Sequence, residues 1–170
     1  FVAVTWSRKQ QKLPALILVH RKQLLDQWIE RTQSFLGIPK KDIGQYYSVK
    51  KKNGEQITIA MMQTLVRAKN FSELQNKFGT IIVDECHHIP AKTFREVISQ
   101  LNSKYIYGLT ATPKRKHNDE PLIYMFIGDI IAQMEQAPPE IISETATISY
   151  KPVKTQIIVR DTNLEVPFKF

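Results

Sequence analysis

Two adjacent carboxylates, Asp84 and Glu85, end the apolar run of IIVDECHH (81–88). The run predicts a buried strand, and the ligands of open α/β sheets bind just outside the carboxyl ends of the strands. Because neighbouring side chains of a strand point to opposite sides, the two carboxylates could take different roles. One could bind a metal ion while the other orients or deprotonates a water molecule. The alternative is a chance Asp-Glu pair at a strand end, and the pair alone does not decide between the two.

Cys86, His87 and His88 follow the carboxylates and raise the question of a zinc site. Zinc ligands are spaced so that their side chains converge, as in C-x₂-C or H-x₃-H, whereas adjacent residues cannot all converge. The chain has a single cysteine. We therefore do not expect zinc, and we expect Cys86 to be a small buried packing residue.

A second group of small polar residues, Thr110 to Thr112, lies in YGLTATPKR (107–115) after another apolar run. Small hydroxyl residues at the end of a strand can hydrogen-bond neighbouring loops. Taken alone, this segment predicts no more than a turn from a strand into a loop.

Apolar runs alternate along the chain with stretches of helical period, and these elements would position both groups. Strands are predicted at 15–20, 43–49, 56–61, 80–85, 104–112 and 129–134, and helices at 21–36, 61–68, 72–78, 90–101 and 120–128. This alternation predicts an α/β fold, with a mostly parallel sheet and helices on both faces. Trp28 shares a helical face with Leu24 and Leu25, so we expect it in the core rather than as a platform for base stacking.

Two further segments interrupt the alternation. The lysine run KKKNG (50–54) is predicted to be an exposed turn, with Asn53-Gly54 as its signal. After Pro138-Pro139 two β-like runs follow without a helix between them. We therefore predict a core domain over 1–137 and a linker or extension over 138–170.

The net charge of +8 is concentrated in the first part of the chain. Residues 1–69 contain 13 Lys/Arg and 4 Asp/Glu, which gives +9, whereas residues 70–170 contain 11 and 12, which gives −1. A basic half indicates a polyanionic partner, nucleic acid above all, and ordinary surface charge is the alternative. The apolar share of 42% excludes a disordered chain, and no apolar stretch approaches the roughly 18 residues of a membrane span. With no secretory signal and no possible internal disulfide, we expect an intracellular, cytoplasmic protein without a membrane partner.

Four segments in order give the chain a family resemblance. VDECHH and, about 20 residues later, GLTATP resemble motifs II and III of superfamily-two helicases and translocases, with VDECH as a variant of the D-E-x-H box. LILVHRKQLLDQW (16–28) resembles motif Ia, and ITIAMMQTLVR (57–67) resembles the DNA-contacting motif that follows it. The pattern is most similar to the DNA-repair helicase and type III restriction-enzyme branch, and it covers roughly residues 1–130.

This resemblance implies an N-terminal RecA-like ATPase domain that uses ATP and Mg²⁺. By resemblance, Asp84 would bind Mg²⁺ through water and Glu85 would activate the attacking water, with His87 beside them at the ATP site. His87 would also relay between the ATP site and the nucleic acid, together with Thr110, Ala111 and Thr112.

The resemblance also implies contacts to one nucleic-acid strand, most simply DNA, through its phosphodiester backbone. The residues are His20, Arg21 and Lys22 of motif Ia, with Gln63 and Thr64 of the next motif. Backbone contacts of this kind do not read sequence. The alternatives are a solvated helix start for Arg21 and Lys22, and a helix cap for Gln63 and Thr64.

One motif of these enzymes does not occur in the sequence. None of the six glycines begins G-x-x-x-x-G-K-[ST], the loop that cradles ATP phosphates. We therefore expect that the chain begins just after this loop, that its sheet is incomplete at the N-terminus, and that a second RecA-like domain lies elsewhere.

The function predicted from the sequence is that of a part of an ATP-dependent DNA helicase or translocase, inactive by itself in ATP hydrolysis. The alternatives are a translocase subunit of a restriction-type nuclease and a basic nucleic-acid-binding module without ATPase activity. The sequence leaves open the polarity of movement, the choice between DNA and RNA, and the oligomeric state.

Overall fold

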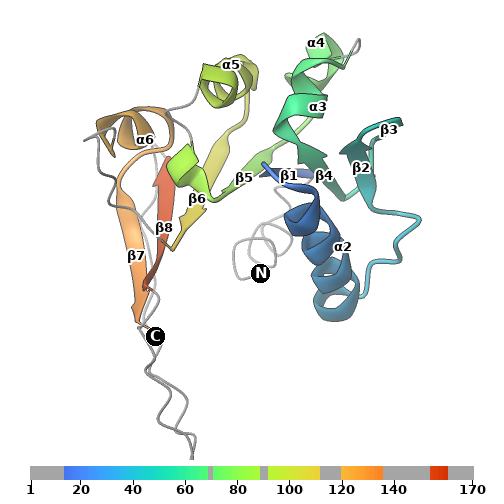
Figure 1. Cartoon of the computed structure of the whole chain (residues 1–170), viewed down its shortest axis with the longest axis horizontal. Coiled ribbons are helices and arrows are strands. Elements are labelled where there is room, and N and C mark those ends of the chain that lie inside the picture. Colours follow the sequence, from blue (N-terminus) through green and yellow to red (C-terminus); the bar gives the residue numbers. More distant parts are fainter. Residues whose placement is uncertain (1–13, 69–70, 89–91, 112–119, 136–153, 161–170) are drawn as a thin grey trace, which may run out of the picture.

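The computed structural model describes residues 14–68, 71–88, 92–111, 120–135 and 154–160, which form an α/β fold around one sheet (Figure 1). The sheet has eight strands in the order β3-β2-β4-β1-β5-β6-β8-β7. The strands are β1 (Ala15–Val19), β2 (Gly44–Tyr47), β3 (Lys50–Lys52), β4 (Ile57–Met61), β5 (Thr80–Asp84), β6 (Tyr105–Thr110), β7 (Ile130–Glu135) and β8 (Lys154–Arg160).

The helices alternate with the strands as the sequence predicted. They are α2 (Lys22–Leu36), α3 (Met62–Val66), α4 (Phe71–Leu74), α5 (Lys92–Gln100) and α6 (Glu120–Phe126), and a 3₁₀ turn η1 (Cys86–His88) follows β5. The predicted fold class, a mostly parallel sheet with helices on both faces, is therefore confirmed. Pro90, predicted to open α5, lies outside the described residues.

The central strands run parallel, and their registers align their carboxyl ends. Strand β1 pairs with β4 and β5, and β5 pairs with β6, all in parallel. Val19 is opposite Met61 at the ends of β1 and β4, and Asp84 is opposite Leu109 near the end of β6. The segments that leave these four strands therefore start from one edge of the sheet, where a site is expected.

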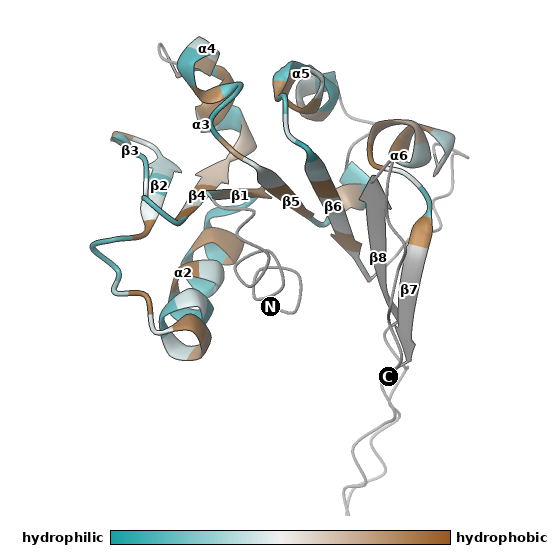
Figure 2. Cartoon of the chain, turned by 180° about the vertical axis from the view of Figure 1, so that it is seen from behind, coloured by the Kyte–Doolittle hydropathy of each residue, from teal (hydrophilic) through white to brown (hydrophobic). Residues whose placement is uncertain are grey.

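Apolar side chains bury both faces of the sheet. Figures 1 and 2 show α2 on one side of the sheet and α3 and α5 on the other. One cluster joins Ile17 and Val19 of β1 to α2, and the other joins Leu16 and Leu18 to α3, α4, α5 and α6. Strand β1 is thus buried on both faces, which explains its unbroken apolar sequence.

Helix α2 carries the segment after β1 and ends as predicted. Leu25, Trp28 and Ile29 are buried on its sheet-facing side. Gly37 closes the helix with φ = 65°, and its N–H donates to the carbonyl of Gln33 at 3.0 Å. A left-handed residue after a helix favours glycine because a side chain there would be strained.

The lysine run was predicted to be a turn, and for Lys50–Lys52 this is wrong. These residues form the edge strand β3, antiparallel to β2, and the tight turn comes earlier, at Ser48, where φ is 52°. Their side chains are exposed. Lysines suit an edge strand because their charge prevents further strands from pairing with it.

The second β-like run of the predicted linker or extension forms strand β8, as its sequence indicated. Strand β8 lies between β6 and β7 and is antiparallel to both, so it extends the sheet. The strand predicted at 129–134 is confirmed as β7. The division of the chain into 1–137 and 138–170 stays a prediction, since residues 136–153 and 161–170 lie outside the described part.

Gly108 lets β6 approach the turn that follows β5. A Cβ atom at this position would lie 2.7 Å from Cδ1 of Ile127 and 2.9 Å from Sγ of Cys86. Cys86 is fully buried, as predicted, and burial raises the pKa of its thiol to about 12. Close packing of β6 therefore fixes η1 and the residues before it.

We expect Gly108→Ala to destabilise the chain by about 1–3 kcal/mol, the usual cost of overpacking a tight core. Urea denaturation would measure the loss. In a Cys86→Ala background, where Sγ is gone, the same substitution should cost less. An equal cost in both backgrounds would contradict packing against Cys86.

Candidate active site at the carboxyl edge of the sheet

The structure brings the described residues of all the predicted groups to one edge of the sheet. Each group directly follows the carboxyl end of a strand, and the four strands are neighbours in the order β4-β1-β5-β6. The groups are Gln63 and Thr64 after β4, His20, Arg21 and Lys22 after β1, Asp84, Glu85 and His87 at and after β5, and Thr110 and Ala111 at and after β6. Thr112 lies outside the described residues.

Asp84 ends β5, and each of its carboxylate oxygens accepts a hydrogen bond. The backbone N–H of Glu85 donates to Oδ1 at 3.1 Å, and the indole Nε1–H of Trp28 donates to Oδ2 at 2.8 Å. Trp28 is only 8% exposed, so its predicted place in the core is confirmed. The hydrogen bond to Asp84 was not predicted.

Glu85 turns the chain from β5 into η1 through a left-handed backbone, with φ = 51°. The N–H of His88 donates to its carbonyl at 3.0 Å and closes the turn. This conformation is strained for a residue with a side chain, and such strain is typical of functional sites, where the surrounding structure maintains it. After the turn, Oε2 of Glu85 lies 3.1 Å from Nδ1 of His87.

The carboxyl group of Glu85 is partly withdrawn from water. Burial raises its pKa, the neighbouring charge of Asp84 raises it further, and Arg21 acts in the opposite direction. A carboxylate with a raised pKa binds a proton more readily, which suits a general base.

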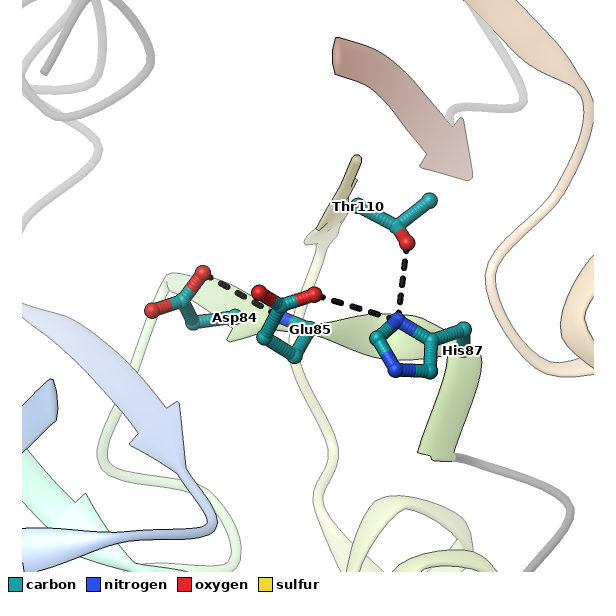
Figure 3. Close-up of polar contacts among 4 residues, drawn as sticks. All are labelled: Asp84, Glu85, His87 and Thr110. Carbon is teal, nitrogen blue, oxygen red and sulfur yellow. Dashed lines mark hydrogen bonds and ion pairs between the residues drawn. The ribbon is translucent and has the colours of Figure 1, made fainter. Parts of the chain in front are cut away.

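His87 lies between Glu85 and the end of β6 (Figure 3). Its Nδ1 is 3.1 Å from Oε2 of Glu85 and 2.9 Å from Oγ1 of Thr110. Which group donates to the other depends on the histidine tautomer. The expected hydrogen bond between His87 and Thr110 is present, and its coupling role stays a prediction.

Three histidine rings, tilted against one another, connect the end of β1 to this turn. The ring centroids of His20 and His88 are 4.3 Å apart, and those of His87 and His88 are 4.2 Å apart. His20 is half-buried, and desolvation, followed by the charge of Arg21, lowers its pKa. Its ring is therefore held against η1, and its predicted contact with nucleic acid stays a prediction.

The other residues predicted to contact nucleic acid are more open. Arg21, Lys22 and Gln63 are exposed and Thr64 is half-buried. Lys22 forms an ion pair with Asp26 at 3.1 Å. The alternative reading of Gln63 and Thr64 as a helix cap has no support, because Met61 is the N-cap of α3 and makes no side-chain capping bond.

The donor set at this edge fits magnesium better than a metal held by protein alone. Among the described residues, no three His, Cys, Asp or Glu side chains form a cluster that could hold a metal ion. Mg²⁺ is usually bound by one or two carboxylates together with phosphate oxygens and water. Asp84 has lone pairs left beside its two hydrogen bonds, so it fits a magnesium ligand.

Comparison with known proteins decides the family. The family described as "Type III restriction enzyme, res subunit" matches residues 1–115 of the chain. The chain belongs to this family. The branch that the four motifs indicated is thereby confirmed.

Two relatives carry helicase or translocase names. A protein of Acanthamoeba polyphaga mimivirus, named as a candidate ATP-dependent RNA helicase, L396, is 32% identical over 89% of the chain and 30% of its own length. The DNA 3'-5' translocase XPB2 of Sulfurisphaera tokodaii is 33% identical over 71% of the chain and 26% of its own length. The chain thus spans less than a third of either relative.

A solved structure shows the same fold. The UvsW helicase from bacteriophage T4 superposes with a TM-score of 0.58 at 21% identity, over 74% of the chain and 46% of the helicase. This likeness confirms the RecA-like arrangement of the sheet and helices.

Two residues of the site were missed by the reading of the sequence. Trp28 reaches Asp84 across 56 positions in the sequence, and His88 stacks on both His20 and His87. Trp28 carried a signal, since a core tryptophan needs a partner for its N–H. His88 carried none beyond its place after the carboxylate box.

Proposed function

We propose that the complete protein is an ATP-dependent DNA helicase or translocase, and that this chain contributes part of its first ATPase domain. The contacts of His87 carry the proposal, because one imidazole joins Glu85 of β5 to Thr110 of β6. A motor that couples hydrolysis to movement needs such a link between its carboxylate and a second element. The names of the two relatives support an ATP-dependent helicase or translocase, and only the name of XPB2 supports DNA as its track. The basic residues 1–69 support a nucleic-acid partner.

Phosphoryl transfer depends on positioning and charge stabilisation more than on covalent chemistry. Mg²⁺ bound with ATP supplies positive charge to the phosphate oxygens. In the proposed reaction, Asp84 would hold that ion, and Glu85 would orient the attacking water and accept its proton. His87 lies beside Glu85 at the same site.

The decisive experiment measures ATP hydrolysis by the complete protein with and without DNA, together with strand displacement. We expect hydrolysis that requires Mg²⁺ and increases with DNA. DNA binding without any ATP turnover would instead favour a basic binding module. Translocation accompanied by DNA cleavage would favour the restriction-type subunit that the family description names.

The proposed contact with nucleic acid is to the phosphate backbone and is independent of sequence. It would run from Arg21 and Lys22, which are exposed at the start of α2, to Gln63 and Thr64 at the start of α3. The ends of β1 and β4 are paired, so the two segments begin side by side.

We expect the double substitution Arg21→Ala and Lys22→Ala to weaken binding equally for all DNA sequences. Each lost phosphate contact should reduce the slope of log affinity against log salt concentration by about 0.9. Fluorescence anisotropy at several salt concentrations would measure it. Lys92→Ala, an exposed lysine on α5, is the matched control and should leave the slope unchanged. An unchanged slope in the double variant would contradict the proposed contact.

We also propose a cytoplasmic location. None of the helices among the described residues combines the length and the apolar character that a membrane crossing needs.

A further inference from the structure

Trp28 makes a contact that core packing alone does not require. Its ring is buried in the cluster between α2 and the sheet, where Leu25 and Ile29 supply apolar neighbours. Its indole N–H leaves this cluster and donates to Oδ2 of Asp84 at 2.8 Å. A phenylalanine could fill much of the same space, but it could not make this bond.

The hydrogen bond from Trp28 restrains the second oxygen of the Asp84 carboxylate. Oδ1 already accepts the N–H of Glu85 at 3.1 Å, which comes from the adjacent residue of the chain. Trp28 holds Oδ2 from a different element. With both oxygens anchored, the carboxylate cannot rotate freely, and its orientation is set by the packing of α2 on the sheet.

The anchored carboxylate keeps acceptor capacity for a further ligand. An ionised carboxylate has about four lone-pair sites, and two of them accept the N–H groups of Trp28 and Glu85. Partners behind a metal ligand orient that ligand and affect metal affinity strongly. The indole N–H of Trp28 is such a partner, because it hydrogen-bonds the Asp84 carboxylate without itself being a ligand.

We propose that Trp28 is a positioning residue for Asp84, and that its indole N–H holds the carboxylate in the orientation that binds Mg²⁺. The proposal rests on the proposed function, because that function assigns Mg²⁺ to Asp84. It gives α2 a second role, since the helix that starts at the proposed nucleic-acid contact also aims the magnesium ligand.

The hydrogen bond itself can be tested without any activity. In the ¹⁵N–¹H spectrum of the complete protein, through-bond correlations to the backbone assign the indole signal of Trp28 without any substitution. We expect Asp84→Asn to shift the Trp28 signal upfield, because an amide oxygen is a weaker acceptor than a carboxylate. Asp26→Asn, on the exposed side of α2, is the control and should leave the Trp28 signal nearly unmoved. An unmoved Trp28 signal in Asp84→Asn would overturn the proposal.

The role in metal binding is tested in the complete protein with Trp28→Phe. We expect the Mg²⁺ concentration at half-maximal ADP binding to rise at least about tenfold, the usual cost of losing a partner behind a metal ligand. At saturating Mg²⁺, ADP binding should return to the level of the unsubstituted protein. Phe35→Leu, which removes an exposed aromatic ring from the other end of α2, is the control and should leave the Mg²⁺ dependence unchanged.

The outcomes separate this proposal from the proposed function. A well-folded Trp28→Phe variant with an unchanged Mg²⁺ dependence would overturn the positioning role and leave the proposed function intact. If the unsubstituted protein bound nucleotide equally well without Mg²⁺, the metal role of Trp28 would fail, whereas the proposed function would fail only if ATP hydrolysis in the presence of Mg²⁺ and DNA were absent. The indole spectrum of Asp84→Asn would still decide whether the hydrogen bond forms, and it uses native Trp28, so it does not depend on the folding of Trp28→Phe.

Discussion

Glu85→Gln in the complete protein is expected to lower kcat for ATP hydrolysis by about 10²- to 10⁴-fold while ATP still binds. The amide keeps the size of the side chain but cannot accept a proton from water, and general base catalysis contributes a factor of this order. The left-handed backbone at residue 85 is equally strained for Gln and Glu, so the turn into η1 should persist. Steady-state hydrolysis and equilibrium nucleotide binding on the same preparation would measure both effects.

The matched control is Glu96→Gln on α5, which removes an exposed carboxylate that is paired with Lys92. Its kcat should stay near that of the unsubstituted protein. If Glu85→Gln also retained kcat, Glu85 would not be the base.

The pH dependence of the reaction gives a second test of Glu85. Burial and the charge of Asp84 raise its pKa above the ordinary value of a glutamate carboxyl group, against the opposing charge of Arg21. Below that pKa Glu85 carries a proton and cannot accept another, so activity is expected to fall as the pH drops through the raised value. A profile of kcat/KM against pH should therefore have its acid limb above the ordinary pKa of a glutamate carboxyl group. An acid limb at the ordinary pKa of a glutamate carboxyl group would show that Glu85 is not partly buried beside Asp84 in the free enzyme.

The sequence predicted the central sheet well, because each central strand is an unbroken apolar run that can only be buried. It did not predict β3, whose three lysines carry no apolar signal and whose pairing depends on β2. Nor did it predict the place of β8, because local sequence does not indicate that a strand will insert between β6 and β7. The position of each of these strands depends on the strands it pairs with, which its own sequence does not indicate.

The same distinction applies to the site. Asp84, Glu85 and Thr110 could be predicted because each stands at the carboxyl end of a buried run, and such positions meet at one edge of a parallel sheet. The partner of Asp84 could not, since Trp28 is 56 positions away and its hydrogen bond depends on how α2 packs. Contacts made by strand ends follow from topology, whereas contacts made across a helix require the packed structure.

Thr110→Val is expected to separate hydrolysis from movement in the complete protein. Valine has nearly the shape of threonine, and Thr110 is only 2% exposed, so the packing at the end of β6 should survive. The hydroxyl near Nδ1 of His87 is lost, and the ring then keeps Glu85 as its neighbour at 3.1 Å. Losing one partner of a buried hydrogen bond costs about 1–3 kcal/mol, which is a shift of about fivefold to about a hundredfold between two coupled states.

Strand displacement should therefore fall at least about fivefold, while ATP hydrolysis in the presence of DNA stays within about twofold of its original rate. Both assays belong on one preparation, with a thermal melt to show that the variant is folded, and Thr93→Val on α5 as the matched control. Because His87 contacts both Glu85 and Thr110, the alternative outcome is informative as well. An equal loss of both activities would mean that Thr110 acts on hydrolysis through the orientation of His87, and the coupling role would be wrong.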